Sequence, residues 1–192
     1  GSPYQVFTQY WRRCTAEGEV TEPLGRAHEL HPPARWPGSE KLEALELEPR
    51  YDWAGGIRAA WTFGEAAAHE TLHTFIDERM QDYDDARDNP AVHGTSALSP
   101  GLHFGEISPR QVWHAVMAAE GAGRRSNGAK AFLSEIGWRE FSYQLLYHFP
   151  HTAESPLREY YAAFPWDEDD EALRAWQRGR TGYPMVDAGM RQ

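Results

Sequence analysis

The sequence has 192 residues, 41% hydrophobic and 25% charged, which is enough for one globular domain with a hydrophobic core. Its net charge of -10 argues against nonspecific nucleic-acid binding by the surface as a whole. The single cysteine, Cys14, excludes an internal disulfide, and no apolar run is as long as a membrane span. We therefore expect a cytoplasmic monomer with no membrane partner.

The first part of the chain shows little periodicity. Residues 22–50 hold most of a proline-rich, acidic stretch, which is typical of an extended connector lying over a domain surface. We assign residues 1–60 to an interdomain connector with an N-terminal segment. Residues 61–192 are then the helical part of the chain.

Two helices are expected in the middle of the chain. From about Gly64 to Tyr83, apolar residues recur at three- and four-residue steps, which predicts one buried stripe on a helix that Asn89 and Pro90 end. Ser108 and Pro109 are a favourable cap and first residue for a second helix. The sequence Gly-Ala-Gly at residues 121–123 is expected to end it.

The rest of the chain also reads as helical. A long helix is predicted from about residue 129 to residue 148, where Pro150 follows, and another is predicted after Trp166, where an acidic run suits the positive end of a helix dipole. A last helix starts at residues 183–184 and reaches Gln192 without a C-cap, so we expect the natural protein to continue. No segment alternates like a strand, and the predicted class is all-α.

A turn rich in hydroxyl groups precedes the second of these helices. Thr95, Ser96 and Ser99 offer three hydroxyls, and the backbone N–H groups of the turn add further donors. A buried pyrophosphate, such as that of FAD, needs donors of this kind. A helix that starts near Ser99 would point its positive end at the same anion, and Arg139 would add a full charge. Taken alone, however, Gly-Thr-Ser is more often a simple capped turn.

Glu135 and Trp138 are three residues apart, so they share one side of the long helix. An indole is a flat surface on which an unstacked base can lie, and a carboxylate can hydrogen-bond to a base edge. The pair would suit a base flipped out of a duplex. The alternative is that Trp138 is a core residue and that Glu135 faces solvent.

Three sequence blocks stand in order: GTSALSPGLHFGEISPRQVW at residues 94–113, FLSEIGWREF at residues 132–141 and GRTGYPMVDAGMRQ at residues 179–192. Together they closely resemble the flavin-binding helical domain of the DNA photolyase and cryptochrome family, and most of all a class I cyclobutane pyrimidine dimer photolyase. The resemblance extends from Tyr83 onward and is looser before it.

This resemblance implies light-driven DNA repair, in which FAD splits cyclobutane pyrimidine dimers by electron transfer, with dimer-containing DNA as the partner. It also implies a second, antenna chromophore in a preceding domain. The FAD contacts that it implies are Tyr83, Thr95, Ser96, Leu98 and Ser99, with Phe132 and Arg139 nearby. The implied DNA contacts are Arg87, Glu135 and Trp138, and Trp166 matches the outermost member of the family's tryptophan electron-transfer chain.

Two alternative functions are weighed against repair. A cryptochrome-type blue-light receptor would use the same cofactor, but the resemblance of Glu135 and Trp138 to the family's repair enzymes favours dimer repair. The second alternative is a zinc hydrolase, because His69, Glu70 and His73 form an HExxH pattern. No clear third ligand follows the pattern, so a metal is not expected.

Overall fold

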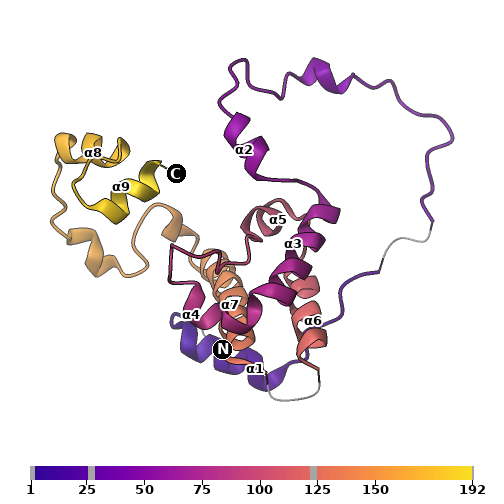
Figure 1. Cartoon of the computed structure of the whole chain (residues 1–192), viewed down its shortest axis with the longest axis horizontal. Coiled ribbons are helices and arrows are strands. Elements are labelled where there is room, and N and C mark those ends of the chain that lie inside the picture. Colours follow the sequence, from indigo (N-terminus) through magenta and orange to yellow (C-terminus); the bar gives the residue numbers. More distant parts are fainter. Residues whose placement is uncertain (1–2, 26–28, 122–124, 192) are drawn as a thin grey trace. The chain divides into compact units, whose positions relative to one another are not determined.

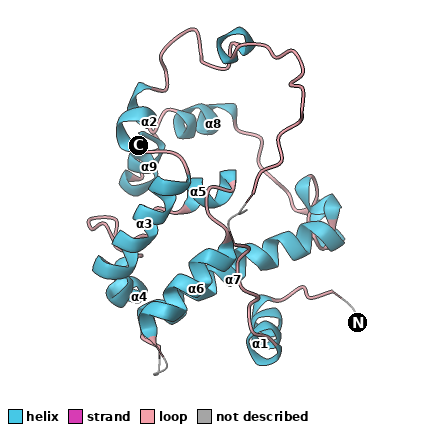
Figure 2. Ribbon diagram, turned by 90° about the vertical axis from the view of Figure 1, so that its right-hand side faces the viewer, coloured by secondary structure: helices cyan, strands magenta, loops and turns pink. Residues whose placement is uncertain are grey.

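The computed structural model describes residues 3–25, 29–121 and 125–191, and every regular element in these ranges is a helix (Figure 2). The all-α prediction is thereby confirmed. The chain divides into two compact units, residues 1–144 and residues 145–192. In the described ranges, no helix combines the length and the apolar character needed to cross a membrane.

The first unit holds most of the helices, which are labelled in Figure 1. They are α1 (Phe7–Glu17), the 3-10 turn η1 (Leu42–Leu45), α2 (Gly55–Ala60), α3 (Glu65–Glu78), the 3-10 turn η2 (Met80–Asp82), α4 (Tyr83–Ala86), α5 (Ser99–Phe104), α6 (Pro109–Glu120) and α7 (Asn127–His148). The second unit, apart from the end of α7, holds η3 (Pro150–Ala153), η4 (Glu159–Ala163), α8 (Asp170–Gln177) and α9 (Pro184–Arg191).

Local signals set the ends of several helices. The Ser108 side chain accepts a hydrogen bond from the Gln111 N–H at 3.2 Å, and the Gln111 side chain accepts one from the Ser108 N–H at 2.8 Å. This reciprocal capping box starts α6, as the Ser-Pro pair predicts. The helix ends at Glu120 with Gly121 as its cap, while residues 122–124 lie outside the described ranges.

The core of the first unit forms where the apolar stripes of α3, α6 and α7 meet. Phe75 of α3 and Val112 and Val116 of α6 are fully buried, and Phe132 and Leu133 of α7 are almost so. The stripe that the sequence predicts between Gly64 and Tyr83 therefore faces the core. The further buried members of this cluster are Ala68, Leu72, Met80, Tyr83, Leu98, Ile107, Ala129 and Ile136.

Three features differ from the sequence expectation. Residues 7–17 and 55–60 are helical, although the sequence analysis assigned no helix to either segment; in the first, Phe7, Tyr10, Trp11 and Cys14 do recur at helical spacing. The helix expected to continue to Asn89 and Pro90 breaks at Arg79, which adopts φ -130° and ψ -22°, and the chain goes on as the turn η2 and the short helix α4. The break redirects the chain just before Tyr83 and so decides where that side chain lies.

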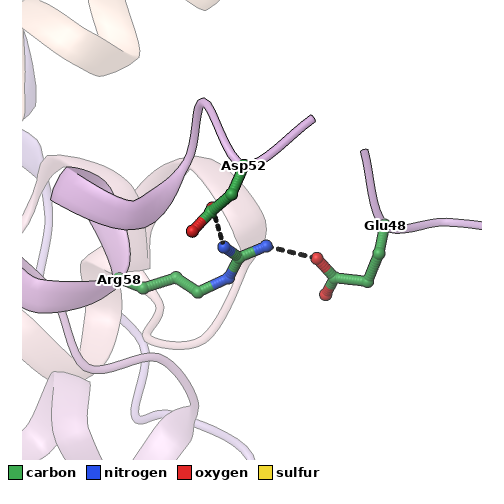
Figure 3. A network of polar contacts seen from close by, with 3 residues as sticks. All are labelled: Glu48, Asp52 and Arg58. Carbon is green, nitrogen blue, oxygen red and sulfur yellow. Dashed lines mark hydrogen bonds and ion pairs between the residues drawn. The ribbon is translucent and has the colours of Figure 1, made fainter. Parts of the chain in front are cut away.

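The proline-rich segment is held to α2 by charge. Arg58 donates a hydrogen bond to Asp52 at 2.5 Å and also pairs with Glu48 (Figure 3). All three side chains are largely exposed, so the pairs orient the segment more than they stabilise the fold. The large apolar side chains of this segment, Trp36 and Trp53 among them, remain exposed.

In the second unit, one carboxylate organises the turn between α8 and α9. Asp187 accepts hydrogen bonds from the Thr181 N–H at 2.7 Å, the Thr181 hydroxyl at 2.6 Å and the Gly182 N–H at 3.0 Å. These hydrogen bonds, the Thr181 side chain first, lower the pKa of Asp187. Arg191 closes the same turn by donating to the Gly179 carbonyl at 2.6 Å.

The turn is therefore expected to lose stability in acid. A carboxyl whose pKa is lowered by folding contributes stability above its ordinary pKa of about 4, and the contribution disappears as the pH falls through the lowered value. The amide proton chemical shifts of Thr181 and Gly182 are followed by NMR as the pH is lowered from neutral to about 2. They should keep their folded values as the pH falls past 4, and change together at lower pH, where Asp187 becomes protonated. In Asp187→Asn these shifts should lose this titration, whereas Asp170→Asn, on the exposed start of α8, should preserve it.

Candidate functional site

The hydroxyl-rich turn is a compact loop between α4 and α5. Leu98 is 2% exposed and anchors the loop in the core, while Thr95 and Ser99 remain exposed and Ser96 is half-buried. The Ser96 hydroxyl accepts a hydrogen bond from the Leu98 N–H at 3.4 Å, and Ala97 between them takes a left-handed φ of 55°. The loop therefore displays its hydroxyls on a fixed backbone, with an apolar side chain beneath them.

A cation that the sequence analysis did not assign to the site lies against this loop. The Nη1 group of Arg79 donates to the Thr95 carbonyl at 3.3 Å, and its Nε is enclosed without a hydrogen-bond partner among the described residues. The helix break at Arg79 brings the side chain there. An enclosed N–H and a positive charge beside several hydroxyls suit an anionic ligand. No sequence signal identifies Arg79, because its role depends on the break.

Tyr83, Arg87 and Glu135 form one polar network between α4 and α7. Arg87 pairs with Glu135, its guanidinium lies 5.8 Å from the centre of the Tyr83 ring, and its Nε is 3.7 Å from Asp88. Burial raises the pKa of Tyr83, and the charge of Glu135 raises it further, whereas Arg87 lowers it. The pKa of Arg87 is raised chiefly by its hydrogen bond to Glu135. The raised pKa keeps the Tyr83 phenol neutral at physiological pH.

Trp138 lies one turn beyond Glu135 on α7 and is 44% exposed. The ring of Phe7, from α1, lies parallel to its indole, with the ring centres 3.7 Å apart and the planes at 11°. Trp138 is therefore neither a core residue nor a free surface residue. Phe7 covers one of its faces, Phe141 packs edge-on against it at a centre distance of 5.7 Å, and part of the residue remains accessible.

Arg139 lines a hollow to which the residues of the hydroxyl-rich loop do not contribute. Its guanidinium bonds to Glu140 at 2.5 Å and lies 4.7 Å from the centre of the Tyr143 ring. It lines a hollow of about 1270 Å³ between α1, α6, α7 and residues 18–24, and the lining does not include Thr95, Ser96 or Ser99. The predicted convergence of Arg139 on these hydroxyls thus stays a prediction.

Leu98, implied as an FAD contact, and Phe132, expected near the FAD, are both part of the core. Leu98 and Phe132 are both almost fully buried, and the Phe132 ring packs against Phe75 and Tyr83 at centre distances of 4.5 and 5.4 Å. They support the loop and Tyr83 from below. Trp166 belongs to the second unit, where it is 79% exposed and lies against Phe164.

The HExxH pattern forms no metal site of its own. Nε2 of His69 lies 3.3 Å from the side-chain amide nitrogen of Gln111, while Glu70 and His73 are exposed on α3. Among the residues that the structure describes, no three His, Cys, Asp or Glu side chains group so that they could hold a metal ion. The pattern is therefore explained as part of the surface of α3.

Comparison with known proteins agrees with this arrangement. Residues 132–192 match the family model described as the FAD binding domain of DNA photolyase. The whole chain is 45% identical to a deoxyribodipyrimidine photo-lyase of Agrobacterium fabrum and 36% identical to cryptochrome-2 of Arabidopsis thaliana, covering 40% and 33% of these proteins. The crystal structure of a bacterial class III photolyase from Agrobacterium tumefaciens matches all of this chain at a TM-score of 0.91 and 44% identity, over 40% of its own length.

The helical fold and the matched segment define a flavin-binding domain of the photolyase type. The chain belongs to the photolyase and cryptochrome family. It spans about 40% of the length of the photolyases that it matches.

Proposed function

We propose that this chain carries part of the flavin and DNA sites of a deoxyribodipyrimidine photolyase, which repairs cyclobutane pyrimidine dimers in DNA with light. The observation that supports this most is the network of Tyr83, Arg87 and Glu135, with Trp138 one turn further on the same helix. The network places a buried phenol, an ion pair and an accessible indole in sequence from α4 along α7. An accessible indole beside a carboxylate that can hydrogen-bond to a base edge suits the recognition of an unstacked base.

The residues of the loop fit a dinucleotide. Bound FAD would supply the light-driven electron donor, while the protein supplies binding, orientation and electrostatics. The hydroxyls of Thr95, Ser96 and Ser99 would donate to its phosphates, and Arg79 would compensate their charge from beside the loop. The neutral phenol of Tyr83 would lie against the cofactor without adding a negative charge.

The α7 residues would receive the flipped dimer. The accessible part of the Trp138 indole would stack on a base, and Glu135 would accept hydrogen bonds from its edge. Arg87 holds Glu135 in place and offsets its charge. This pairing reduces the repulsion between the carboxylate and the DNA phosphates, so that both members of the pair contribute to DNA binding.

The comparisons, more than the site, bear on the class of photolyase. The sequence resemblance is to class I enzymes, but a solved structure that matches the whole chain is described as a bacterial class III photolyase, which supports class III over class I. We therefore favour a class III enzyme.

In the second unit, the exposed ring of Trp166 would be the entry point for electrons that reduce an oxidised flavin.

A blue-light receptor is the second candidate, because cryptochrome-2 of Arabidopsis thaliana aligns with the whole chain. Illumination of the natural protein that carries this chain, with a dimer-containing oligonucleotide, separates the two functions. A photolyase restores the intact pyrimidines under blue light and not in the dark. Flavin photoreduction without any repair would instead identify a receptor.

Trp138→Ala tests the stacking surface. We expect this variant of the natural protein to bind a dimer-containing oligonucleotide more weakly by about 1–3 kcal/mol, the range for loss of one base–aromatic stack. Fluorescence anisotropy of a labelled oligonucleotide in the dark measures the affinity. Trp36→Ala, which removes a more exposed indole from the connector, should bind as the wild type does. Equal affinities of Trp138→Ala and the wild type would remove Trp138 from the substrate site.

A further inference from the structure

We infer that Phe7 is a positioning residue for dimer recognition, because its ring backs one face of Trp138 and leaves the opposite face for the flipped base. This inference rests on the proposed function, in which Trp138 stacks on the substrate. The ring centres of Phe7 and Trp138 are 3.7 Å apart and the planes differ by 11°. At this distance the two rings are in van der Waals contact, and neither water nor a base fits between them.

The covered face leaves only one way for a base to stack. Trp138 is 44% exposed although Phe7 lies flat against it, so its exposed area lies away from the face that Phe7 covers. A base that stacks on Trp138 must then lie on the side away from α1. The order of rings in the complex would be Phe7, Trp138 and base.

Phe7 is itself held by neighbours on both helices. Trp11, one turn further on α1, lies nearly parallel to it, with ring centres 6.0 Å apart and planes at 13°. Phe141 of α7 meets Phe7 and Trp138 edge-on, at centre distances of 5.9 and 5.7 Å. The stacked rings of Phe7 and Trp138 are therefore held by contacts with both Trp11 and Phe141.

The close approach of α1 to α7 depends on Gly137. A Cβ atom at Gly137 would lie 2.5 Å from two carbons of the Trp11 ring, which is closer than real contacts allow. The absence of a side chain there lets Trp11 lie on the backbone of α7, directly beside Trp138. The packing of Trp11 on Gly137 fixes the position along α7 at which Phe7 contacts the indole of Trp138.

The expected benefit is preorganisation. An unsupported indole on a helix surface samples several rotamers and must be ordered when a base stacks on it, whereas a ring backed by Phe7 is already in place. Loss of that ordering is expected to weaken dimer binding by about 2- to 10-fold, the equivalent of freeing one side chain. The effect should be specific for damaged DNA, because undamaged duplex presents no flipped base to Trp138.

The test is Phe7→Leu in the natural protein, with affinities for dimer-containing and undamaged oligonucleotides measured in the dark. We expect the affinity for the dimer to fall about 2- to 10-fold and the affinity for undamaged DNA to stay constant. Phe7→Tyr keeps the flat ring and should retain wild-type affinity. Tyr4→Leu removes an aromatic ring of the same segment that packs on Tyr10, and it should also leave the affinity unchanged.

A double-mutant cycle excludes a merely structural effect. In the Trp138→Ala background, Phe7→Leu should weaken dimer binding no further, because no indole is left to position. If Phe7→Leu weakens binding further in that background, Phe7 does not act through Trp138. If Phe7→Leu binds as the wild type does while Trp138→Ala binds more weakly, Phe7 has no positioning role, although Trp138 keeps its own. Wild-type affinity of Trp138→Ala overturns the substrate stack and the role of Phe7 with it. If Phe7→Leu does not fold, Phe7→Met removes the flat ring while leaving an apolar side chain, and the same outcomes decide.

Discussion

Gly128→Ala is expected to destabilise the first unit by about 3 kcal/mol, at the upper end of the range for overpacking a well-packed site. A Cβ atom at Gly128, in the first turn of α7, would lie 1.9 Å from the Met80 carbonyl oxygen and 2.8 Å from that of Gln81. Both neighbours are backbone atoms of η2, which immediately precedes Tyr83, so relief requires α7 and η2 to separate. Urea unfolding of the chain, followed by far-UV circular dichroism, measures the loss.

Gly56→Ala is the matched control. Gly56 also lies in a helix of the first unit, but a Cβ atom there has no neighbour within 4 Å. Alanine favours a helix over glycine, so this variant should be as stable as the wild type, or more stable by up to about 1 kcal/mol. If Gly128→Ala and Gly56→Ala unfold at the same urea concentration, the contact between α7 and η2 is wrong, and with it the placement of Glu135 beside Arg87.

Phe75→Ala is expected to cost about 3–5 kcal/mol, the range for removing a buried aromatic side chain. Phe75 is fully buried in the core, and its ring contacts those of Phe132 and Tyr83 at centre distances of 4.5 and 5.4 Å. The substitution leaves a cavity directly beneath the predicted flavin contacts. Thermal and urea unfolding measure the change, and Phe104→Ala, at a position that is 73% exposed, should stay within about 0.5 kcal/mol of the wild type.

The outcome of Phe75→Ala also reports on the site. If the variant still folds, the Tyr83 ring loses the edge contact that holds it and gains mobility. In the natural protein, FAD should then dissociate more readily, which flavin absorbance after gel filtration would show. A small loss of stability, similar to that of Phe104→Ala, would mean that the three rings do not form the centre of the core.

The helices that local signals determine could be predicted from the sequence. The Ser108-Pro109 start of α6 and the buried stripe through Leu72 and Phe75 lie where we expected them. Capping and amphipathic spacing act between residues at most four positions apart, so both are legible in the chain itself. The helix α1 was missed although Phe7, Tyr10 and Trp11 stand at helical spacing, whereas the six-residue helix α2 is too short for periodicity to reveal it, so packing decides there.

The candidate site likewise contains residues that the sequence identified and residues that only the structure revealed. The sequence identified the hydroxyls of the loop between α4 and α5, and Glu135 and Trp138 on one side of α7. It did not indicate that the helix would break at Arg79, or that the Arg79 guanidinium would donate a hydrogen bond to the Thr95 carbonyl of that loop. It also did not show that the side chains of Leu98, an implied FAD contact, and of Phe132, expected nearby, are buried in the core.

The sequence by itself determined the helical class, the main helix ends and the residue types that can hold a phosphate or stack on a base. Only the tertiary structure decided which of them meet: Arg87 with Glu135, Arg79 with the Thr95 carbonyl, and Phe7 with one face of Trp138. The physical reason is that these contacts join residues far apart in the chain. They depend on how closely helices approach, which glycines such as Gly128 and Gly137 set by leaving out a side chain.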